Sequence, residues 1–244
     1  MRMSPNALQG YWGETNKPLV NLAFVAPLLL AYESGLLLLG PLAMRNGADV
    51  WLRQLLQFLG FGQYFLLPAI TCGLLLAWHH IARYSWRLRG RVLYGMLLES
   101  LVFGAALVVI AQLHVSVLAI EPPDSGVLES AGDAVSYVGA GIYEELVFRL
   151  MLLSALIAGA QRIGVPRLSS FCAAVILSSV IFAAAHYRFE LGGEPFLRLI
   201  GEPFVSSVFW FRCMAGVLFS ILFLCRGFGI AVGAHAFYDI LVAC

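Results

Sequence analysis

The feature that most constrains the fold is a series of apolar stretches, each close to the length of a bilayer-spanning helix, that do not alternate between polar and apolar residues. Lipid cannot hydrogen-bond backbone N–H and C=O groups, so such stretches cross a membrane as α-helices of about 20 residues. Only 12% of the 244 residues are charged, whereas a soluble domain carries roughly 25%. We therefore expect an all-α, polytopic integral membrane helical bundle in contact with the lipid bilayer.

About seven transmembrane helices plus one interfacial helix are expected, in one membrane domain with three parts. The parts are a polar N-terminal segment at 1–17, the N-terminal transmembrane helices and interfacial helix at 18–133, and the helices that hold the site at 134–244. The expected spans are 18–39, 64–80, 92–114, 134–160, 168–186, 203–225 and 228–243.

Residues 49–61 favour a helix that lies flat in the membrane interface, because apolar and polar side chains segregate to its two sides. The apolar side holds Trp51, Leu55, Phe58 and Leu59, and the polar side holds Arg53, Gln54 and Gln57.

The distribution of positive charge predicts the orientation. With seven spans, nine arginine and lysine residues fall on one face and four on the other, which favours a cytoplasmic N-terminus and a C-terminus outside. The net charge is +1 and Lys17 is the single lysine, so the chain offers no means to neutralise a run of phosphates. Nucleic acid is therefore excluded as a partner.

Ionisable residues gather in the second half of the chain, although each costs roughly 2.5–3.5 kcal/mol at the centre of a spanning helix. Glu145 and Arg149 are four residues apart, share a helix face and are expected to form an ion pair. Glu144 is rotated by about 100° from Glu145 and has no partner on its own helix. One glutamate is thus held as structure, while Glu144 stays free for chemistry.

Two further pairs repeat the four-residue spacing. Phe182 and His186 form the first pair, and His235 and Asp239 form the second. Small residues surround both histidines, and they let neighbouring helices approach closely. We expect the two histidines to converge with Glu144 in one functional site.

Three kinds of chemistry are open to a glutamate and two histidines. A zinc hydrolase would show HExxH or a similar arrangement, which this sequence lacks. Haem ligation by His186 and His235 would leave Glu144 and Asp239 unexplained. Metal-free hydrolysis, with Glu144 as general base, matches the residues present. We therefore expect no cofactor, although zinc is not excluded.

Three motifs in order resemble those of the CPBP superfamily, which includes the type II CAAX prenyl endopeptidases (Ras-converting-enzyme-like) and bacteriocin-processing proteins. EELVFR at 144–149, FAAAH at 182–186 and HAFYD at 235–239 are similar to its EExxxR, FxxxH and HxxxN/D motifs. The resemblance covers roughly 134–244 and implies an intramembrane glutamic endopeptidase.

By position, the resemblance implies that Glu144 activates water and that His186 positions it and relays a proton to the leaving amine. His235 and Asp239 would form the oxyanion side, Glu145 and Arg149 would brace the site, and Phe182 would pack beside His186. The prenyl proteases carry Asn at the last position, and an ionised Asp239 would repel an oxyanion. Asp239 therefore either stays protonated or orients His235.

The expected orientation opens the site away from the cytoplasm, where a prenylated cytosolic tail would not reach. We therefore expect a membrane-anchored protein or peptide as substrate, in a bacterial plasma membrane. The alternative is a non-catalytic scaffold or immunity-type relative. Outside the motifs, Glu33 or Glu99 is expected to pair with Arg212 between helices.

Overall fold

The computed structural model describes residues 5–40, 45–62, 64–118, 131–187, 190–191, 194–195 and 202–243. Nearly all of them lie in helices, so the all-α fold class is confirmed. The first half holds α1 (Pro5–Thr15), α2 (Pro18–Leu39), α3 (Gly47–Phe58), α4 (Leu66–Ile81) and α5 (Gly90–Leu118).

The second half begins with one continuous helix in which a π-helical segment lies between two α-helical segments. These are α6 (Ala131–Glu145), the π-helical segment η2 (Leu146–Leu153) and α7 (Ser154–Arg162). The remaining elements are α8 (Arg167–Ala184), the short antiparallel strands β1 (Glu190–Leu191) and β2 (Glu194–Pro195), α9 (Ser206–Arg226) and α10 (Phe228–Val242).

Four helices in the described ranges are long and apolar enough to cross a membrane: α2, the 25 residues Gly90–His114 of α5, α8 and α9. Helices α4 and α10 are apolar but have only 16 and 15 residues. Fifteen helical residues rise about 22 Å, whereas the hydrocarbon core is about 30 Å thick. The predicted membrane bundle is confirmed at this level, but the predicted number of seven spans is not.

A helix, α3, forms where an interfacial helix was predicted at 49–61, but it begins at Gly47 and ends at Phe58. Its apolar side is exposed at Leu55 and Phe58, as expected for contact with lipid. Arg53, in contrast, turns toward the protein, where it bonds to the carboxylates of Asp49 and Glu33. The polar side of α3 is therefore partly an anchor to the bundle.

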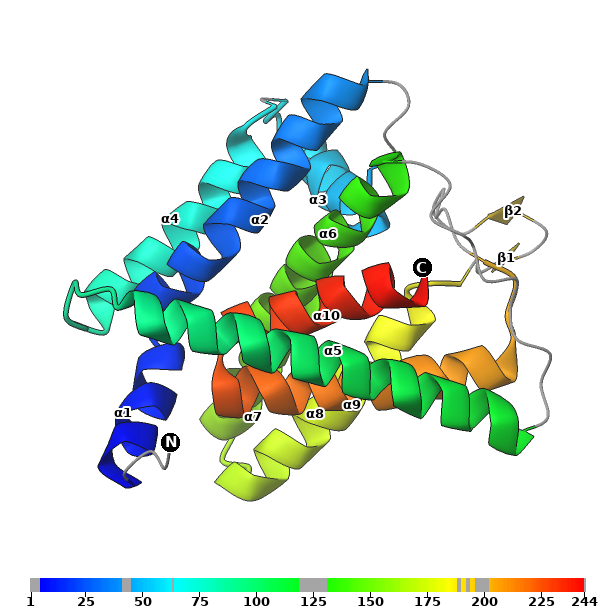
Figure 1. The fold of residues 1–244 in the computed structure, drawn as a ribbon. Coiled ribbons are helices and arrows are strands. Elements are labelled where there is room, and N and C mark those ends of the chain that lie inside the picture. The colour runs from blue at the N-terminus through cyan, green and yellow to red at the C-terminus, as the bar shows by residue number, and fades with distance from the viewer. Residues whose placement is uncertain are drawn as a thin grey trace.

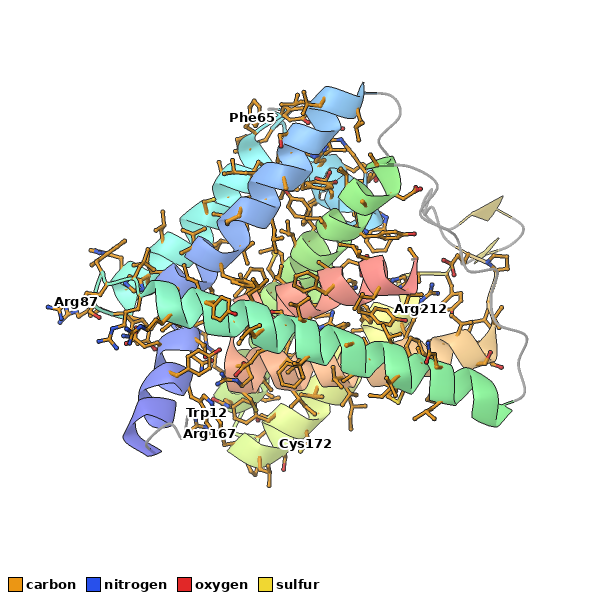
Figure 2. The ribbon with its side chains drawn as sticks, in the orientation of Figure 1. Trp12, Phe65, Arg87, Arg167, Cys172 and Arg212 are labelled. Carbon is orange, nitrogen blue, oxygen red and sulfur yellow. The ribbon has the colours of Figure 1, made fainter. Side chains whose placement is uncertain are left out.

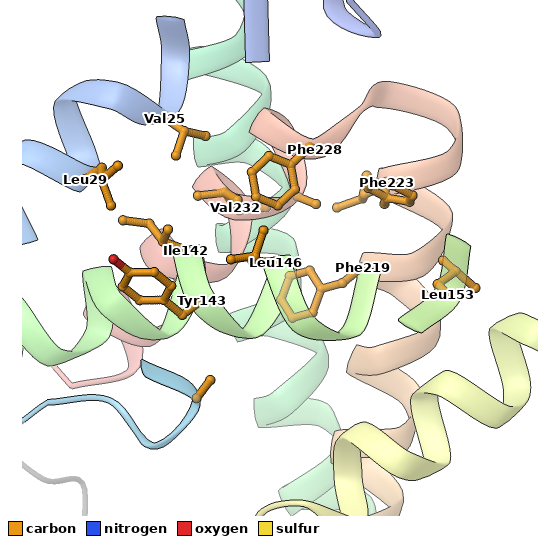
Figure 3. Packing of buried hydrophobic residues seen from close by; sticks show 14 of the residues in the cluster. Val25, Leu29, Ile142, Tyr143, Leu146, Leu153, Phe219, Phe223, Phe228 and Val232 are labelled. Carbon is orange, nitrogen blue, oxygen red and sulfur yellow. The ribbon is translucent and has the colours of Figure 1, made fainter. Parts of the chain in front are cut away.

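Helix α6 packs between α2 and α10, and α10 also packs along α5 (Figure 1). Figure 3 shows the apolar core that these helices share with α9. Val25 and Leu29 of α2 meet Ile142 and Tyr143 of α6, and Phe228 of α10 belongs to the same buried cluster. The ionisable end of α6 is thus surrounded by packed helices.

Gly227 lets α10 follow α9 without a loop. Its φ of 95° lies in a region that L side chains rarely adopt, and its N–H caps α9 at the carbonyls of Leu222 and Phe223. The two helices form a tight antiparallel hairpin, in which Phe219 and His235 each lie eight residues from the turn. This symmetry places the two rings side by side.

Gly141 permits a close approach of α6 to α10. A Cβ built at Gly141 would lie 2.8 Å from the backbone N of Ala236 and 2.9 Å from the backbone O of Val232. Backbone atoms cannot move aside as a flexible side chain can. The separation of the two helices that hold Glu144 and His235 therefore depends on this glycine.

We predict that Gly141→Ala destabilises the bundle by about 1–3 kcal/mol, because the added methyl group forces α6 and α10 apart. The free energy of unfolding of the full chain in detergent micelles measures this cost. Gly73→Ala is the matched control, since a Cβ at Gly73 of α4 meets nothing within 4 Å. A Gly141→Ala variant as stable as Gly73→Ala would contradict the prediction.

Candidate active site

The two adjacent glutamates close α6 and point at the same imidazole from different sides. Glu145 Oε1 lies 2.8 Å from His235 Nδ1, and Glu144 Oε2 lies 3.8 Å from His235 Nε2. Since a carboxylate only accepts, the His235 Nδ1–H donates to Glu145. The 100° rotation between the two glutamates therefore brings them to opposite nitrogens of one ring.

The predicted ion pair between Glu145 and Arg149 forms, with Glu145 Oε1 3.1 Å from Arg149 Nη1. Both side chains are almost completely buried. The guanidinium also donates from Nη2 to the carbonyl of Gly216 at 3.3 Å and lies over the Phe182 ring, 4.3 Å from its centroid. Arg149 thus neutralises a carboxylate that would otherwise be buried without compensation.

Aromatic rings fix the orientation of both histidines. Phe219 of α9 stacks on His235 with ring centroids 4.6 Å apart and an interplanar angle of 14°. Phe182 contacts His186 edge to face at 5.0 Å, as the motif resemblance implied, and lies 6.1 Å from His235. Phe182 therefore contacts both histidines as well as Arg149.

His186 lies just beyond the end of α8 and has one nitrogen occupied. Its Nδ1 lies 2.9 Å from the carbonyl of Phe182, and because a carbonyl only accepts, Nδ1 carries the proton. Burial lowers the pKa of His186, while the Glu144 carboxylate acts to raise it. A neutral His186 then presents the lone pair of Nε2 to Glu144 Oε2, 3.7 Å away.

The two oxygens of Glu144 have different surroundings. Oε1 accepts a hydrogen bond from Asn46 Nδ2 at 3.0 Å. Oε2 has no hydrogen-bond partner among the described residues and faces the Nε2 atoms of both histidines. The distances of 3.7 and 3.8 Å exceed a direct hydrogen bond, so Oε2 is near both rings but bonded to neither.

Asp239 lies 3.6 Å from His235 Nε2, too far for a direct hydrogen bond, and its side chain is 18% exposed. The nitrogen that could fix the His235 ring, Nδ1, is taken by Glu145. Glu145, rather than Asp239, is therefore the closest carboxylate that orients His235.

A cavity of about 300 Å³ reaches this cluster from the side of α3. Its walls come from the start of α3, from the end of α6 and from the chain that follows α8. They are formed by Asn46, Gly47, Ala48, Trp51, Glu144, Phe148, Ala185, His186 and Glu202. Within the described residues, no group of three or more His, Cys, Asp or Glu residues is placed to hold a metal ion.

Sequence reasoning missed Asn46, which lies 98 positions before Glu144 and belongs to no motif. An asparagine immediately before an amphipathic helix does indicate a helix cap, but nothing in the sequence links that cap to α6. The expected pairing of Arg212 was also wrong. Arg212 bonds to Glu202, whereas Glu33 bonds to Arg53 and Tyr143, and Glu99 bonds to Arg226.

Comparison with known proteins gives one match. Residues 132–241 match the family model described as type II CAAX prenyl endopeptidase Rce1-like. This range contains all seven residues of the three motifs. The comparisons with curated proteins and with solved structures returned no match.

We predict that Glu145→Gln and Arg149→Met each cost about 3–5 kcal/mol of stability, because each leaves a buried charge without its partner. The double variant should lose clearly less than the sum of the two. Unfolding of the four proteins in detergent micelles measures the coupling.

The pair Glu202 and Arg212, whose carboxylate is 61% exposed, provides the matched control cycle, for which about 0–1 kcal/mol is expected. Additive losses at Glu145 and Arg149 would contradict the interpretation of this pair as a structural brace.

Proposed function

We propose that this chain, whose residues 132–241 match the Rce1-like type II CAAX prenyl endopeptidase family model, is an intramembrane endopeptidase with Glu144 as general base. One observation carries the proposal. Glu144 Oε2 is buried, lacks a hydrogen-bond partner in the described part of the chain, and faces two imidazole nitrogens at the end of a cavity.

The proposed reaction begins with a water molecule bound between Glu144 Oε2 and His186 Nε2. Both atoms are acceptors, so the water donates one hydrogen to each and turns an oxygen lone pair toward the cavity. Glu144 takes a proton as that oxygen attacks the carbonyl carbon of the substrate peptide bond. The product of this step is a tetrahedral intermediate with a negatively charged oxygen.

His235 stabilises that oxygen by donating from Nε2, in a ring that is protonated on both nitrogens and whose Nδ1–H is accepted by Glu145. Collapse of the intermediate breaks the C–N bond, and the proton taken by Glu144 passes through His186 to the leaving nitrogen. The products are a carboxylic acid and an amine, so the sum of the steps is hydrolysis. Asp239, which also faces His235 Nε2, fits this role when it is protonated.

The proposed substrate is a membrane-anchored protein or peptide that is cut near its terminus. Trp51 and Phe148 give the cavity apolar walls, and the exposed apolar side of α3 lies next to it. A chain held in the bilayer would present its polar terminal residues at this depth. Comparison of protein termini in membranes with and without the enzyme identifies the cleaved bond.

We predict that Glu144→Gln lowers kcat for cleavage of such a substrate by about 10²- to 10⁴-fold, because it removes the base and keeps the size of the side chain. Proteomic detection of shifted termini in cells, followed by cleavage of a matching peptide by the purified full chain, measures the effect.

Glu14→Gln is the control, since Glu14 pairs with Lys17 at the far end of the bundle and should leave kcat unchanged. A zinc chelator should also leave kcat unchanged. Loss of activity in the chelator would favour a metal enzyme. Normal cleavage by Glu144→Gln would refute Glu144 as the base and leave a non-catalytic role open.

We further propose that the cavity opens outward from a bacterial plasma membrane, with the N-terminus in the cytoplasm. Phe65 and Arg87 lie at opposite ends of α4 (Figure 2). Arg87 belongs to the cation-rich turn between α4 and α5, whereas Phe65 lies in the connection from α3 to α4. Positive charge favours the cytoplasmic side, which assigns the cavity to the opposite side.

A cysteine at Gly62, introduced into a cysteine-free chain, should react with a membrane-impermeant maleimide added to intact cells. A cysteine at Arg87 should react only after the cells are permeabilised. Both positions are exposed in the structure. The reverse pattern would show that the cavity faces the cytoplasm.

A further inference from the structure

We propose that Asn46 is a positioning residue that holds Glu144 so that one carboxylate oxygen is open to the two histidines. The inference rests on the proposed function, which makes Glu144 the general base. Asn46 lies outside the matched range 132–241, in the half of the chain without motifs. Its amide nitrogen lies 3.0 Å from Glu144 Oε1.

The direction of this hydrogen bond follows from a second contact of the same side chain. Asn46 is the N-cap of α3, and its Oδ1 accepts the backbone N–H of Ala48 at 2.8 Å. The oxygen must face Ala48, because a backbone N–H requires an acceptor. The NH₂ group is therefore turned toward Glu144 and can only donate.

Helix α3 is itself fixed, so Asn46 cannot drift away from Glu144. The buried carboxylate of Asp49 accepts bonds from the hydroxyl of Tyr32 at 2.9 Å, from Arg45 Nη1 at 2.7 Å and from Arg53 Nε at 2.6 Å. Arg53 also reaches Glu33 of α2 at 3.2 Å. The first turn of α3 is thus fixed to α2, and Asn46 therefore holds a fixed position beside Glu144.

The consequence for Glu144 is that its two oxygens have different roles. A donated hydrogen bond stabilises the ionised carboxylate and fixes the plane of the group. With Oε1 bound by Asn46, Oε2 is left toward His186 and His235. Charged and titratable groups face Glu144 from its own helix, from the end of α8, from α10 and from the cavity wall. They are Glu145, Arg149, His186, His235, Asp239 and Glu202.

Two substitutions separate this role from helix capping. Asp and Ser both cap helices well, so Asn46→Asp and Asn46→Ser keep the acceptor for Ala48. Asn46→Asp replaces the amide donor by a like charge against Glu144, and Asn46→Ser removes the donor. If capping is the sole role of Asn46, both variants behave as the unmodified protein.

The first experiment needs no substrate. Dicyclohexylcarbodiimide reacts with protonated carboxyl groups in apolar surroundings, and mass spectrometry of the full chain in micelles quantifies the adduct on Glu144 as a function of pH. Asn46→Asp should move the midpoint of labelling to higher pH by at least about one unit, and Asn46→Ser should move it in the same direction by less.

The second experiment measures cleavage of the peptide identified from shifted termini. Both variants should lower kcat by roughly 10- to 100-fold with little change in KM, the range found when a group that orients a metal ligand is lost. The acidic limb of the kcat profile of Asn46→Asp should move to higher pH. Asn16→Asp, the same change at the far end of the bundle, should alter neither readout.

The outcomes distinguish the two proposals. A labelling midpoint that is unchanged in Asn46→Asp, or no adduct on Glu144 at any pH, would overturn the role of Asn46 whatever the protein cleaves. Shifted labelling together with normal cleavage by Glu144→Gln would overturn the proposed function and leave the contact between Asn46 and Glu144 in place.

Discussion

The structure depends on how one buried positive charge is compensated. Arg149 lies almost fully buried in a bundle of apolar helices, and Glu145, the Gly216 carbonyl and the faces of two aromatic rings surround it. An uncompensated guanidinium in such surroundings would be costly. Because Glu145 also accepts from His235, the same arrangement ties α6, η2 and α10 together. Buried ion pairs are seldom more stable than apolar packing, so the arrangement is best understood as the framework of a site.

That framework explains why two neighbouring glutamates have different surroundings. Arg149 and His235 both contact Oε1 of Glu145, whereas Glu144 is held at Oε1 by Asn46 and faces two imidazoles with Oε2. The change from α-helix to π-helix immediately after Glu145 occurs where these contacts are made, and π-helical turns are frequent at functional sites. A carboxylate held at one oxygen and open at the other is suited to accept a proton.

The membrane setting gives α3 a double role. Its exposed apolar residues are suited to lipid, while Asp49 and Arg53 fasten its inner side to α2. A helix anchored in this way can form the wall of a cavity and supply Asn46 at a fixed position. The half of the chain that carries no motif therefore completes the surroundings of Glu144, and the N-terminal helices are more than a membrane anchor.

The sequence by itself determined the helical membrane fold and the pairing of Glu145 with Arg149, because these follow from apolar runs and from four-residue spacing. The contact of Phe182 with His186 was implied by the motif resemblance. The limits of the helices were also close to those expected, since lipid demands a minimum length of apolar chain. Only the tertiary structure decided which residues meet across helices. The contacts of Asn46 with Glu144 and of Glu145 with His235 join segments far apart in the sequence, whose relative depth and rotation are set by packing, and local spacing carries no information about either.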